Sequence, residues 1–523
     1  MRTIASDAIV GTWIGACAMN QHWVYLEAHF TTEAFTLTGT IDMHFEGESD
    51  LAITQAHLEL SHIRFALAHA TGTWIFDGHH SDGMISGTVT SGEEQGTFHL
   101  VAVAAVDPAI YDTYAGSYQL EADRVISIAP FRGEAGCPYP VYVDVASGRI
   151  GALFPTSATT FVAGPVFLRP FPPELHVTFV SDNERNVIGL RWRQHEGVEQ
   201  WAPKTLLKHE DVSFQNDTVT LAGTLTTPAS TGSHPAIVLI HGSGDQRRDH
   251  AFLQFIADLF ALHGIAVLAY DKRGVGASTG DSDTAMLADL AGDALAGVAF
   301  LQTRPDITPH QIGLWGISQG GWIAPLAAAQ SRNVAFIILV SGPAVSVVQQ
   351  DVDRVAYELR AGGFSEDEVR AAITHEQLFS DVAFTGQGWD KLEASIQHAR
   401  ATRWASIVAL PSQDEFERYG SLWGQFRAYD PIPQLQQVTC PVLALFGGRD
   451  TVVPPAKNAP LLERALKAGG NRDYTITVFP DGDHVIMATP TGARRDVPLW
   501  TQFVPGYFAT MLDWLRARVN TAG

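Results

Sequence analysis

The alternation of apolar and amphipathic segments after about residue 207 constrains the fold of this chain more than any other feature. Apolar segments such as AIVLIHG, AVLAYDKRG and PVLALFGGRD alternate with amphipathic stretches such as AFLQFIADLFALHG and MLADLAGDALAGVAFLQTR. Near-continuous apolar strands are typical of parallel sheets, because helices cover both faces of such a sheet and bury every side chain. The pattern therefore predicts a doubly wound, mostly parallel α/β sheet over residues 207–523.

One long segment interrupts this alternation. Residues from about 345 to 437 contain helical patterns, such as DVDRVAYELRAGG and FERYGSLWGQFRAYD, without an apolar strand between them. Ligands of open α/β sheets bind outside the carboxyl ends of the strands. A long insertion between two strands therefore predicts a helical lid over that edge. The alternative is a structural appendage that does not touch the substrate.

The first 206 residues have a different pattern. Short alternating segments with Gly, Asp and Ser turns, such as AFTLTGTIDMHF and GMISGTVTSG, are typical of antiparallel sheets or barrels. Residues 1–107, which open on GTWIG and continue in repeated hairpins, resemble a lipocalin-like β-barrel. The same pattern continues over residues 108–206 and predicts a second small β domain there. The chain is thus expected to have three domains, with boundaries near residues 107 and 206.

Composition excludes several classes of function. The net charge is −22, from 34 Lys and Arg against 56 Asp and Glu, and no basic stripe is visible. Such a charge repels nucleic acids and anionic membranes, so neither is an expected partner. Three distant cysteines imply no disulfide framework. No segment has the features of a signal peptide or the length of a membrane span, so we expect a cytoplasmic protein, although a chain trimmed of a signal peptide would look the same.

The segment LWGISQGG carries the strongest sign of chemistry. Gly316, Ser318 and Gly320 form a G-x-S-x-G pattern between an apolar strand and a helical segment. In that context the pattern is typical of a nucleophile elbow, a tight turn that projects a serine hydroxyl above the sheet. Because Gly-rich chains match this string by chance, the strand and helix on either side carry the argument. Ser318 is the predicted nucleophile.

A serine hydroxyl needs a general base, and the base needs a residue that orients it. When a nucleophile elbow is present, an acidic residue and then a histidine follow in sequence, each after a strand. Asp450 ends PVLALFGGRD, and His484 ends YTITVFPDGDH. The sequence therefore predicts the triad Ser318, Asp450 and His484. Asp450 could instead cap a turn, and Asp481 or Asp483 could take its role.

Acyl transfer also needs two N–H donors for the oxyanion. Gln319 directly follows the nucleophile, and its backbone N–H is the first candidate. The second candidate is the backbone N–H of Ser243, in the turn HGSG that follows the strand AIVLI. A Gly-rich loop without a donor role is the alternative for this turn. We expect His241 to be a packed loop residue rather than a second base.

Two other motifs are not expected to bind a cofactor or a metal. GVGASTG, at residues 274–280, follows a strand as a dinucleotide fingerprint does, but its helix begins too late, so a turn is the better interpretation. His79 and His80 are adjacent in a predicted hairpin and lack further ligands at useful spacing. We therefore expect no cofactor and no metal.

Together these motifs resemble α/β-hydrolase-fold serine esterases, namely bacterial carboxylesterases related to the prolyl oligopeptidase and serine aminopeptidase groups. The likeness spans about residues 209–520, and a looser one, opening at YDTYAGSYQL, links the second β unit to the β domain of some serine hydrolases. It implies a cofactor-free acyl-enzyme mechanism on a small-molecule ester. The charged stretch DQRRD after HGSG departs from the pattern, and no propeller repeats precede the sheet. The motifs that carry the likeness are IVLIHGSG, LAYDKRGVGASTGD, GLWGISQGGWIAP, LFGGRDTVVPP and FPDGDH.

Several alternatives stay open at this point. A serine peptidase or amidase would use the same triad, whereas acyl-CoA thioesterases of similar layout commonly place Cys at the elbow and dehalogenases place Asp there. Outside enzymes, the N-terminal barrel could hold an apolar ligand while the hydrolase domain is vestigial. The acyl and alcohol preferences, the role of the β domains and the oligomeric state, a homodimer included, are not set by the sequence.

Overall fold

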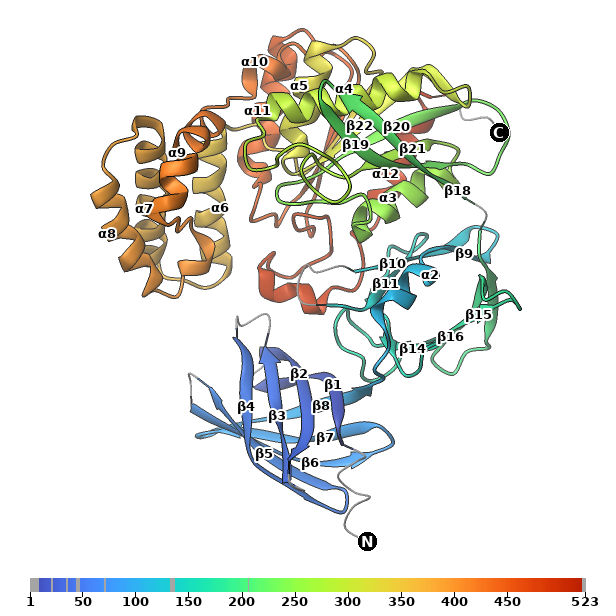
Figure 1. Cartoon of the computed structure of the whole chain (residues 1–523), viewed down its shortest axis with the longest axis vertical. Helices are drawn as coiled ribbons and strands as arrows, with labels where there is room; N and C mark the ends of the chain where they lie inside the picture. Colours follow the sequence, from blue (N-terminus) through green and yellow to red (C-terminus); the bar gives the residue numbers. More distant parts are fainter. Residues whose placement is uncertain are drawn as a thin grey trace. The chain divides into compact units, whose positions relative to one another are not determined.

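The structure is a computed structural model that describes residues 9–19, 22–33, 36–43, 48–69, 72–131, 137–205 and 207–519. It divides the chain into two compact units (Figure 1). The first unit contains the residues up to Thr205 together with Arg495–Gln502, and the second contains the rest of the chain. Among the described residues, no helix has both the length and the apolar character that a membrane span requires.

An eight-stranded antiparallel barrel opens the first unit. Each strand pairs with its neighbour in sequence, and β1 closes the barrel against β8. The buried interior is crowded with aromatic rings, and Phe65 stacks on Phe76 with ring centroids 4.7 Å apart. The predicted N-terminal antiparallel barrel is confirmed. Its strands are β1 (Gly11–Met19), β2 (His22–Glu33), β3 (Thr36–Met43), β4 (Glu48–Glu59), β5 (His62–His69), β6 (Gly72–Ser81), β7 (Met84–Ser91) and β8 (Glu94–Val103).

The rest of the first unit contains two smaller antiparallel sheets around an aromatic core. One sheet has the order β12-β11-β10-β9, and the other has the order β13-β14-β15-β16-β17. The segment Arg495–Gln502 also belongs to this unit, because the Ile150 N–H donates a hydrogen bond to the Thr501 carbonyl over 2.9 Å. The elements are η1 (Pro108–Ile110), α2 (Tyr111–Tyr114), β9 (Gly116–Glu121), β10 (Arg124–Pro130), β11 (Pro140–Asp144), β12 (Ile150–Ala152), β13 (Phe154–Pro155), β14 (Thr160–Ala163), β15 (Leu175–Ser181), β16 (Val187–Gln194) and β17 (Gln200–Pro203).

The second unit is built on an eight-stranded sheet in the order β18-β19-β21-β20-β22-β23-β24-β25. The strands from β20 onward run parallel to one another and to β21, whereas the opening hairpin is antiparallel. The predicted doubly wound, mostly parallel sheet is therefore confirmed. The strands are β18 (Lys208–Asn216), β19 (Val219–Thr227), β20 (His234–Ile240), β21 (Ala266–Tyr270), β22 (Ile307–Ile317), β23 (Ile337–Val340), β24 (Val442–Gly447) and β25 (Tyr474–Phe479).

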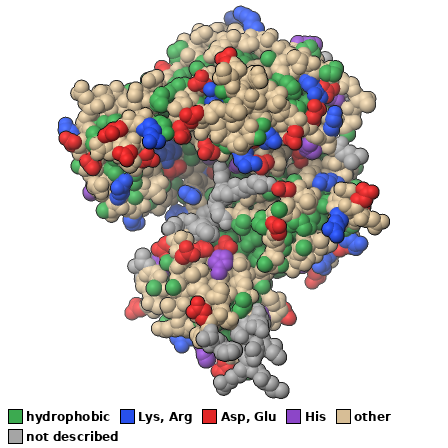
Figure 2. Space-filling view, in the orientation of Figure 1, with side chains coloured by type: hydrophobic (Ala, Val, Ile, Leu, Met, Phe, Trp, Pro, Cys, Tyr) green, Lys and Arg blue, Asp and Glu red, His purple; other side chains and the backbone are tan. Residues whose placement is uncertain are grey.

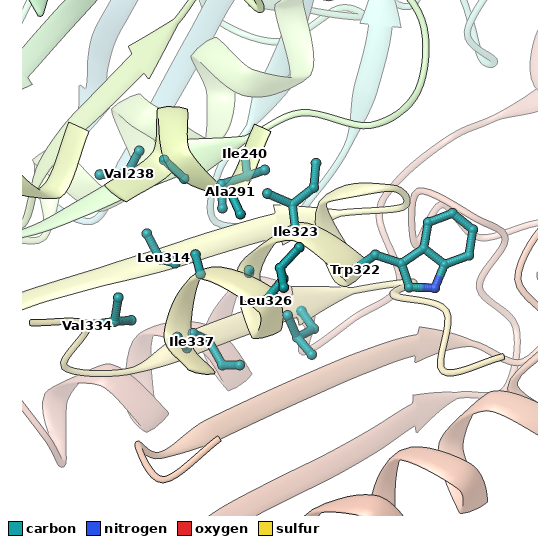
Figure 3. Close-up of a cluster of buried hydrophobic side chains, with 14 of the residues drawn as sticks. Val238, Ile240, Ala291, Leu314, Trp322, Ile323, Leu326, Val334 and Ile337 are labelled. Carbon is teal, nitrogen blue, oxygen red and sulfur yellow. The ribbon is translucent and has the colours of Figure 1, made fainter. Parts of the chain in front are cut away.

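Helices cover both faces of this sheet. Side chains of α4, α5 and α11 share one buried apolar cluster with the strands, and α3 and α12 lie on the opposite face (Figure 1). In the close-up, Trp322, Ile323 and Leu326 of α5 pack onto the strands (Figure 3). The helices are α3 (Ala251–Leu262), α4 (Leu287–Gln302), α5 (Gly320–Gln330), α10 (Ile432–Leu435), α11 (Pro455–Ala468) and α12 (Tyr507–Arg516), with η4 at Arg494–Leu499.

The segment between β23 and β24 is helical, as the sequence predicted, and its part from Val347 to Arg427, which precedes α10, is the helical insertion. Ser346, Ser365 and Ser412 cap the starts of α6, α7 and α9, because each side chain accepts a hydrogen bond from a backbone N–H in the first turn. Two buried apolar clusters hold the insertion together. Its elements are α6 (Val347–Ala361), α7 (Glu366–Thr385), α8 (Trp389–Arg400), η3 (Ala405–Ile407) and α9 (Gln413–Arg427).

Asn458 of α11 anchors the chain where it enters the helical insertion. Its side chain is fully buried, accepts hydrogen bonds from the Ala344 and Val345 N–H groups, and donates to the Pro454 carbonyl. Asn458→Ala leaves these groups buried without partners, so we expect the free energy of unfolding to fall by about 2–4 kcal/mol. Denaturant unfolding followed by tryptophan fluorescence measures this loss. The exposed Asn333→Ala is the control, and equal stabilities of the two variants would contradict the prediction.

Surface charge is mixed on the face shown in Figure 2. The Lys and Arg side chains drawn there lie scattered among acidic side chains rather than in a continuous stripe. Neighbouring charges of opposite sign form many ion pairs in the described residues, for example Arg304 with Glu210 and Arg360 with Glu366. Exposed pairs such as Arg360–Glu366 contribute little to stability.

Candidate active site

Ser318 lies in a strained turn between β22 and α5. Its φ angle is +54°, a value that residues other than glycine rarely adopt. The flanking glycines are required by close backbone approach, since a Cβ at Gly320 would lie 2.8 Å from the Ile240 carbonyl oxygen. This is the geometry of a nucleophile elbow, in which strain holds the serine side chain above the sheet.

Asp450 follows β24, His484 follows β25, and the two side chains are hydrogen-bonded to each other. The distance from His484 Nδ1 to Asp450 Oδ2 is 2.9 Å. Asp450 is 2% exposed, and its Oδ1 accepts hydrogen bonds from the Val452 and Val453 N–H groups, which fix the carboxylate. With Nδ1 donating to Asp450, Nε2 of the neutral ring is free to accept a proton.

Two opposing effects set the pKa of His484. Burial by itself lowers the pKa, but the charge of Asp450 and the hydrogen bond to it outweigh burial and raise the pKa above its usual value. A base with a raised pKa holds an abstracted proton more firmly near neutral pH. The pair is therefore suited to general-base chemistry.

Asp481 and Asp483, the competing acidic residues, have other partners. Asp481 forms an ion pair of 2.8 Å with Arg449. Asp483 is buried, and its Oδ1 accepts hydrogen bonds from the N–H groups of Val485 and Met487. Burial raises the pKa of Asp483 to about 7. Among the described residues, Asp450 alone hydrogen-bonds the His484 ring.

Ser318 is the one predicted triad member without a hydrogen bond to the others. Within the described part of the chain, Ser318 Oγ makes no hydrogen bond, so the structure pairs Asp450 with His484 but not His484 with Ser318. Hydrogen bonds of catalytic groups are often long before substrate binds and shorten in the complex. All three residues nevertheless follow parallel strands of one sheet, β22, β24 and β25, with β23 between the first two.

The two predicted oxyanion donors lie at the same cavity as Ser318. Ser243 belongs to the turn after β20, and a Cβ at the adjacent Gly242 would lie 3.5 Å from Ser318 Cβ, so this turn runs against Ser318. Neither the Gln319 N–H nor the Ser243 N–H donates to another described residue. Both are therefore available to a ligand oxygen.

Lys272 is a site residue that the sequence analysis did not identify. It is 8% exposed, and its Nζ donates to the carbonyl oxygens of Gly242 and Gly244, each at 3.2 Å, and to Gln319 Oε1 at 2.8 Å. Burial lowers its pKa to about 8, although the nearby Asp245 carboxylate opposes this shift. The sequence holds no local signal for this residue, because its contacts are with segments that are distant in the sequence.

The turns around the site are fixed by buried polar contacts. His241 is 2% exposed, its Nε2 bonds the Tyr270 carbonyl, and burial lowers its pKa to about 3, so it is a neutral packing residue as expected. Residues 274–280 form a turn around Asp271, whose carboxylate accepts the Ala277 N–H. In the described part of the chain, no three His, Cys, Asp or Glu side chains group in a way that could hold a metal ion.

A cavity of about 730 Å³ lies over Ser318. The sheet side supplies the polar residues Ser243, Ser318 and Gln319, and the helical insertion supplies most of the apolar wall together with all of the charged lining residues. The insertion therefore faces the candidate site rather than standing away from it. The lining residues are Ser243, Ser318, Gln319, Trp322, Pro343, Val347, Gln350, Asp351, Arg354, Phe379, Ala409, Leu410, Pro411, Glu415, Trp423, Phe426, Arg427, Val452 and Val453.

Comparison with known proteins places this second unit among hydrolases. The family model for serine aminopeptidase, S33, matches residues 231–490. Esterase EstD of Thermotoga maritima is 24% identical over 334 residues, which cover 62% of this chain and 72% of EstD. A polyketide transferase of Penicillium is 36% identical over 140 residues, 26% of this chain and 45% of that protein.

Solved structures are also similar. An esterase of Pyrococcus furiosus aligns over 60% of this chain and 92% of its own, with 17% identity and a TM-score of 0.42. The assignment itself rests on the strand order, the elbow at Ser318 and the family match. The second unit has the α/β-hydrolase fold, and its residues 231–490 match the serine aminopeptidase S33 family.

Proposed function

We propose that this protein is a serine hydrolase that cleaves carboxylic esters through an acyl-enzyme intermediate. The observation that carries the proposal is the hydrogen-bonded Asp450–His484 pair, which follows β24 and β25 of the same sheet whose β22 leads into the strained turn of Ser318. Acyl transfer by a serine requires a base that a carboxylate orients and that can take the proton of the serine hydroxyl. The likeness to esterase EstD supports an ester as the substrate.

The mechanism assigns each of these groups one role. His484 Nε2 takes the Ser318 proton as Oγ attacks the ester carbonyl, and the N–H groups of Gln319 and Ser243 stabilise the oxyanion. His484 then gives the proton to the departing alcohol as the ester bond breaks. Water, activated by the same base, attacks the acyl-enzyme and releases the acid. Each oxyanion donor is expected to lower the barrier by roughly 3–4 kcal/mol.

Parallel substrates separate this proposal from its alternatives. The family match to serine aminopeptidases favours peptide or amide cleavage as the second candidate. Hydrolysis of a p-nitrophenyl ester and of the p-nitroanilide with the same acyl group distinguishes the two directly. We expect kcat/KM to be far higher for the ester. A higher value for the anilide would replace the esterase proposal with a peptidase, and no turnover of either, with no serine labelling, would favour a vestigial site.

The helical insertion is proposed to act as a lid that selects the acyl group. Leu410, on the loop before α9, lines the cavity over Ser318. Leu410→Trp places a larger side chain there, so we expect kcat/KM for an octanoate ester to fall about tenfold and that for an acetate ester to change much less. A p-nitrophenyl ester chain-length series measures the difference.

The matched control for this variant is Phe384→Trp. Phe384 belongs to the same insertion but is 47% exposed and does not line the cavity, so its replacement should leave the chain-length preference unchanged. A parallel loss of activity on short and long esters in Leu410→Trp would contradict the lid assignment. So would an equal shift in preference in Phe384→Trp.

A further inference from the structure

The ammonium group of Lys272 is saturated by the two segments that carry the proposed oxyanion donors. Two of its hydrogen bonds go to the turn containing Ser243, at the Gly242 and Gly244 carbonyls, and the third goes to the Gln319 side chain. An ammonium group has three N–H donors. All three are therefore used, and none is left to bind a substrate.

Peptide geometry connects the first of these bonds to the Ser243 N–H. The Gly242 carbonyl and the Ser243 N–H belong to the same peptide group, which is planar and trans, so the two point in opposite directions. An ammonium group fixed at the carbonyl oxygen thus fixes the direction of the N–H. The bond to the Gly244 carbonyl restrains the following part of the same loop. Without this bond Gly244 could adopt other backbone conformations, because glycine has few steric limits.

The third bond ties this loop to the nucleophile turn. Gln319 directly follows Ser318, is 9% exposed, and its Oε1 accepts the Lys272 proton at 2.8 Å. One cation thereby links two segments, near residues 243 and 319, that are far apart in the sequence. The distance between the two backbone N–H groups decides whether both reach one oxyanion, because such donors act only within about 2.7–3.1 Å of it.

The surroundings of Lys272 also make its charge effective. It lies on the loop that follows β21, where its charge interacts with the buried ring of His241 and with the Asp245 carboxylate, and Asp271 is its neighbour in the sequence. The Asp271 carboxylate accepts the Arg248 and Ala277 N–H groups. In a site shielded from water a positive charge favours a nearby oxyanion more strongly than in solvent.

We propose that Lys272 is a positioning residue that holds the Ser243 and Gln319 backbone N–H groups in place as one oxyanion hole. This inference rests on the proposed hydrolase function. Lys272 does not contact the substrate in this proposal. It sets the geometry and the polarity of the groups that do. A lysine with a merely structural role would affect stability but not the kcat of the folded enzyme.

The first test is Lys272→Met, assayed with p-nitrophenyl acetate. We expect kcat to fall about 100-fold, as when an oxyanion donor is lost, while KM changes little, because the donors act mainly in the transition state. Lys272→Arg keeps the charge and should restore part of the loss. Lys467→Met removes an exposed lysine paired with Glu463 and serves as the control with unchanged kcat. An unchanged kcat in folded Lys272→Met would overturn the proposal.

Gln319→Leu provides a second test that does not empty the lysine site. It removes one of the three anchors and keeps the backbone N–H, so a smaller fall in kcat is expected. In the Lys272→Met background the same change should add almost nothing, because both variants break one linkage. Fully additive effects of the two substitutions on kcat would contradict the linkage. If Lys272→Met fails to fold, Gln319→Leu alone decides the matter, because an unchanged kcat in that variant would contradict the linkage.

Two further measurements distinguish positioning from structural support. The affinity for a trifluoromethyl ketone, which forms a tetrahedral adduct with an oxyanion, should fall in Lys272→Met as much as kcat/KM does. Because the pKa of Lys272 is lowered to about 8, the wild-type kcat should also fall above that pH, and this fall should be absent in Lys272→Met. An unchanged inhibitor affinity would overturn the inference. A wild-type enzyme inactive on every ester would instead refute the proposed function.

Discussion

Replacing Ser318 with alanine is expected to lower kcat for p-nitrophenyl acetate by about 10⁴- to 10⁶-fold, because no other group can form the acyl-enzyme. The strained turn, with φ at +54°, and the neighbouring Asp450–His484 pair are the basis of this expectation. The residual rate comes from the oxyanion donors and from binding alone. Steady-state kinetics with purified protein measures the loss.

The control for this variant is Ser331→Ala, at the other end of α5. Ser331 ends the helix that Ser318 precedes, and its hydroxyl accepts a hydrogen bond from the Asn333 N–H, away from the cavity. Its kcat should equal that of the wild type. Both variants should unfold at similar denaturant concentrations. If Ser318→Ala retained most of its activity on the ester, Ser318 would not be the nucleophile.

Asp450→Asn is expected to have the second-largest effect, a loss of about 10⁴-fold in kcat. An asparagine amide can donate to His484 Nδ1, which would place the ring proton on Nε2. A protonated Nε2 cannot accept the proton of Ser318. The 2.9 Å bond and the 2% exposure of Asp450 leave no room for water to replace the carboxylate. The loss is measured as kcat at a pH where wild-type His484 is neutral.

The pH dependence has a definite sign. Wild-type activity requires neutral His484, whose pKa is raised by Asp450, so activity is lost as the pH falls through that raised value. Without the Asp450 charge the pKa of His484 falls, and the remaining activity of Asp450→Asn should persist to lower pH. A pH profile of kcat/KM for both proteins tests the shift.

Asp483→Asn is the matched control for this prediction. An asparagine Oδ1 can accept the same hydrogen bonds from the Val485 and Met487 N–H groups, so the loop should keep its shape. We expect its kcat to fall by much less than that of Asp450→Asn. A larger loss in Asp483→Asn would transfer the orienting role to Asp483.

The sheet and the site residues could be predicted from the sequence because they depend on local patterns. Apolar runs identify buried strands, and parallel strands bring their carboxyl ends to one edge, so residues following β22, β24 and β25 had to gather there. The turn of Ser318 carries its own local signature in Gly316 and Gly320. The closed N-terminal barrel followed from repeated hairpins, each of which is also a local feature.

Other features depend on contacts between distant segments and left no local pattern. Lys272 is defined by its distances to the Gly242 carbonyl and the Gln319 side chain, which no spacing rule relates to it. The joining of Arg495–Gln502 to the sheets before residue 205 depends on backbone hydrogen bonds across more than half of the chain. The face that the helical insertion turns toward the cavity likewise depends on its packing.

Covalent labelling tests the central claim most directly. The protein is treated with a fluorophosphonate, and its intact mass and peptide map are measured, with Ser318→Ala treated in parallel. We expect one phosphonyl group per chain, on the peptide that contains Ser318, together with loss of esterase activity and no adduct on the variant. An adduct on another residue, or full esterase activity in protein that carries no adduct, would contradict the account.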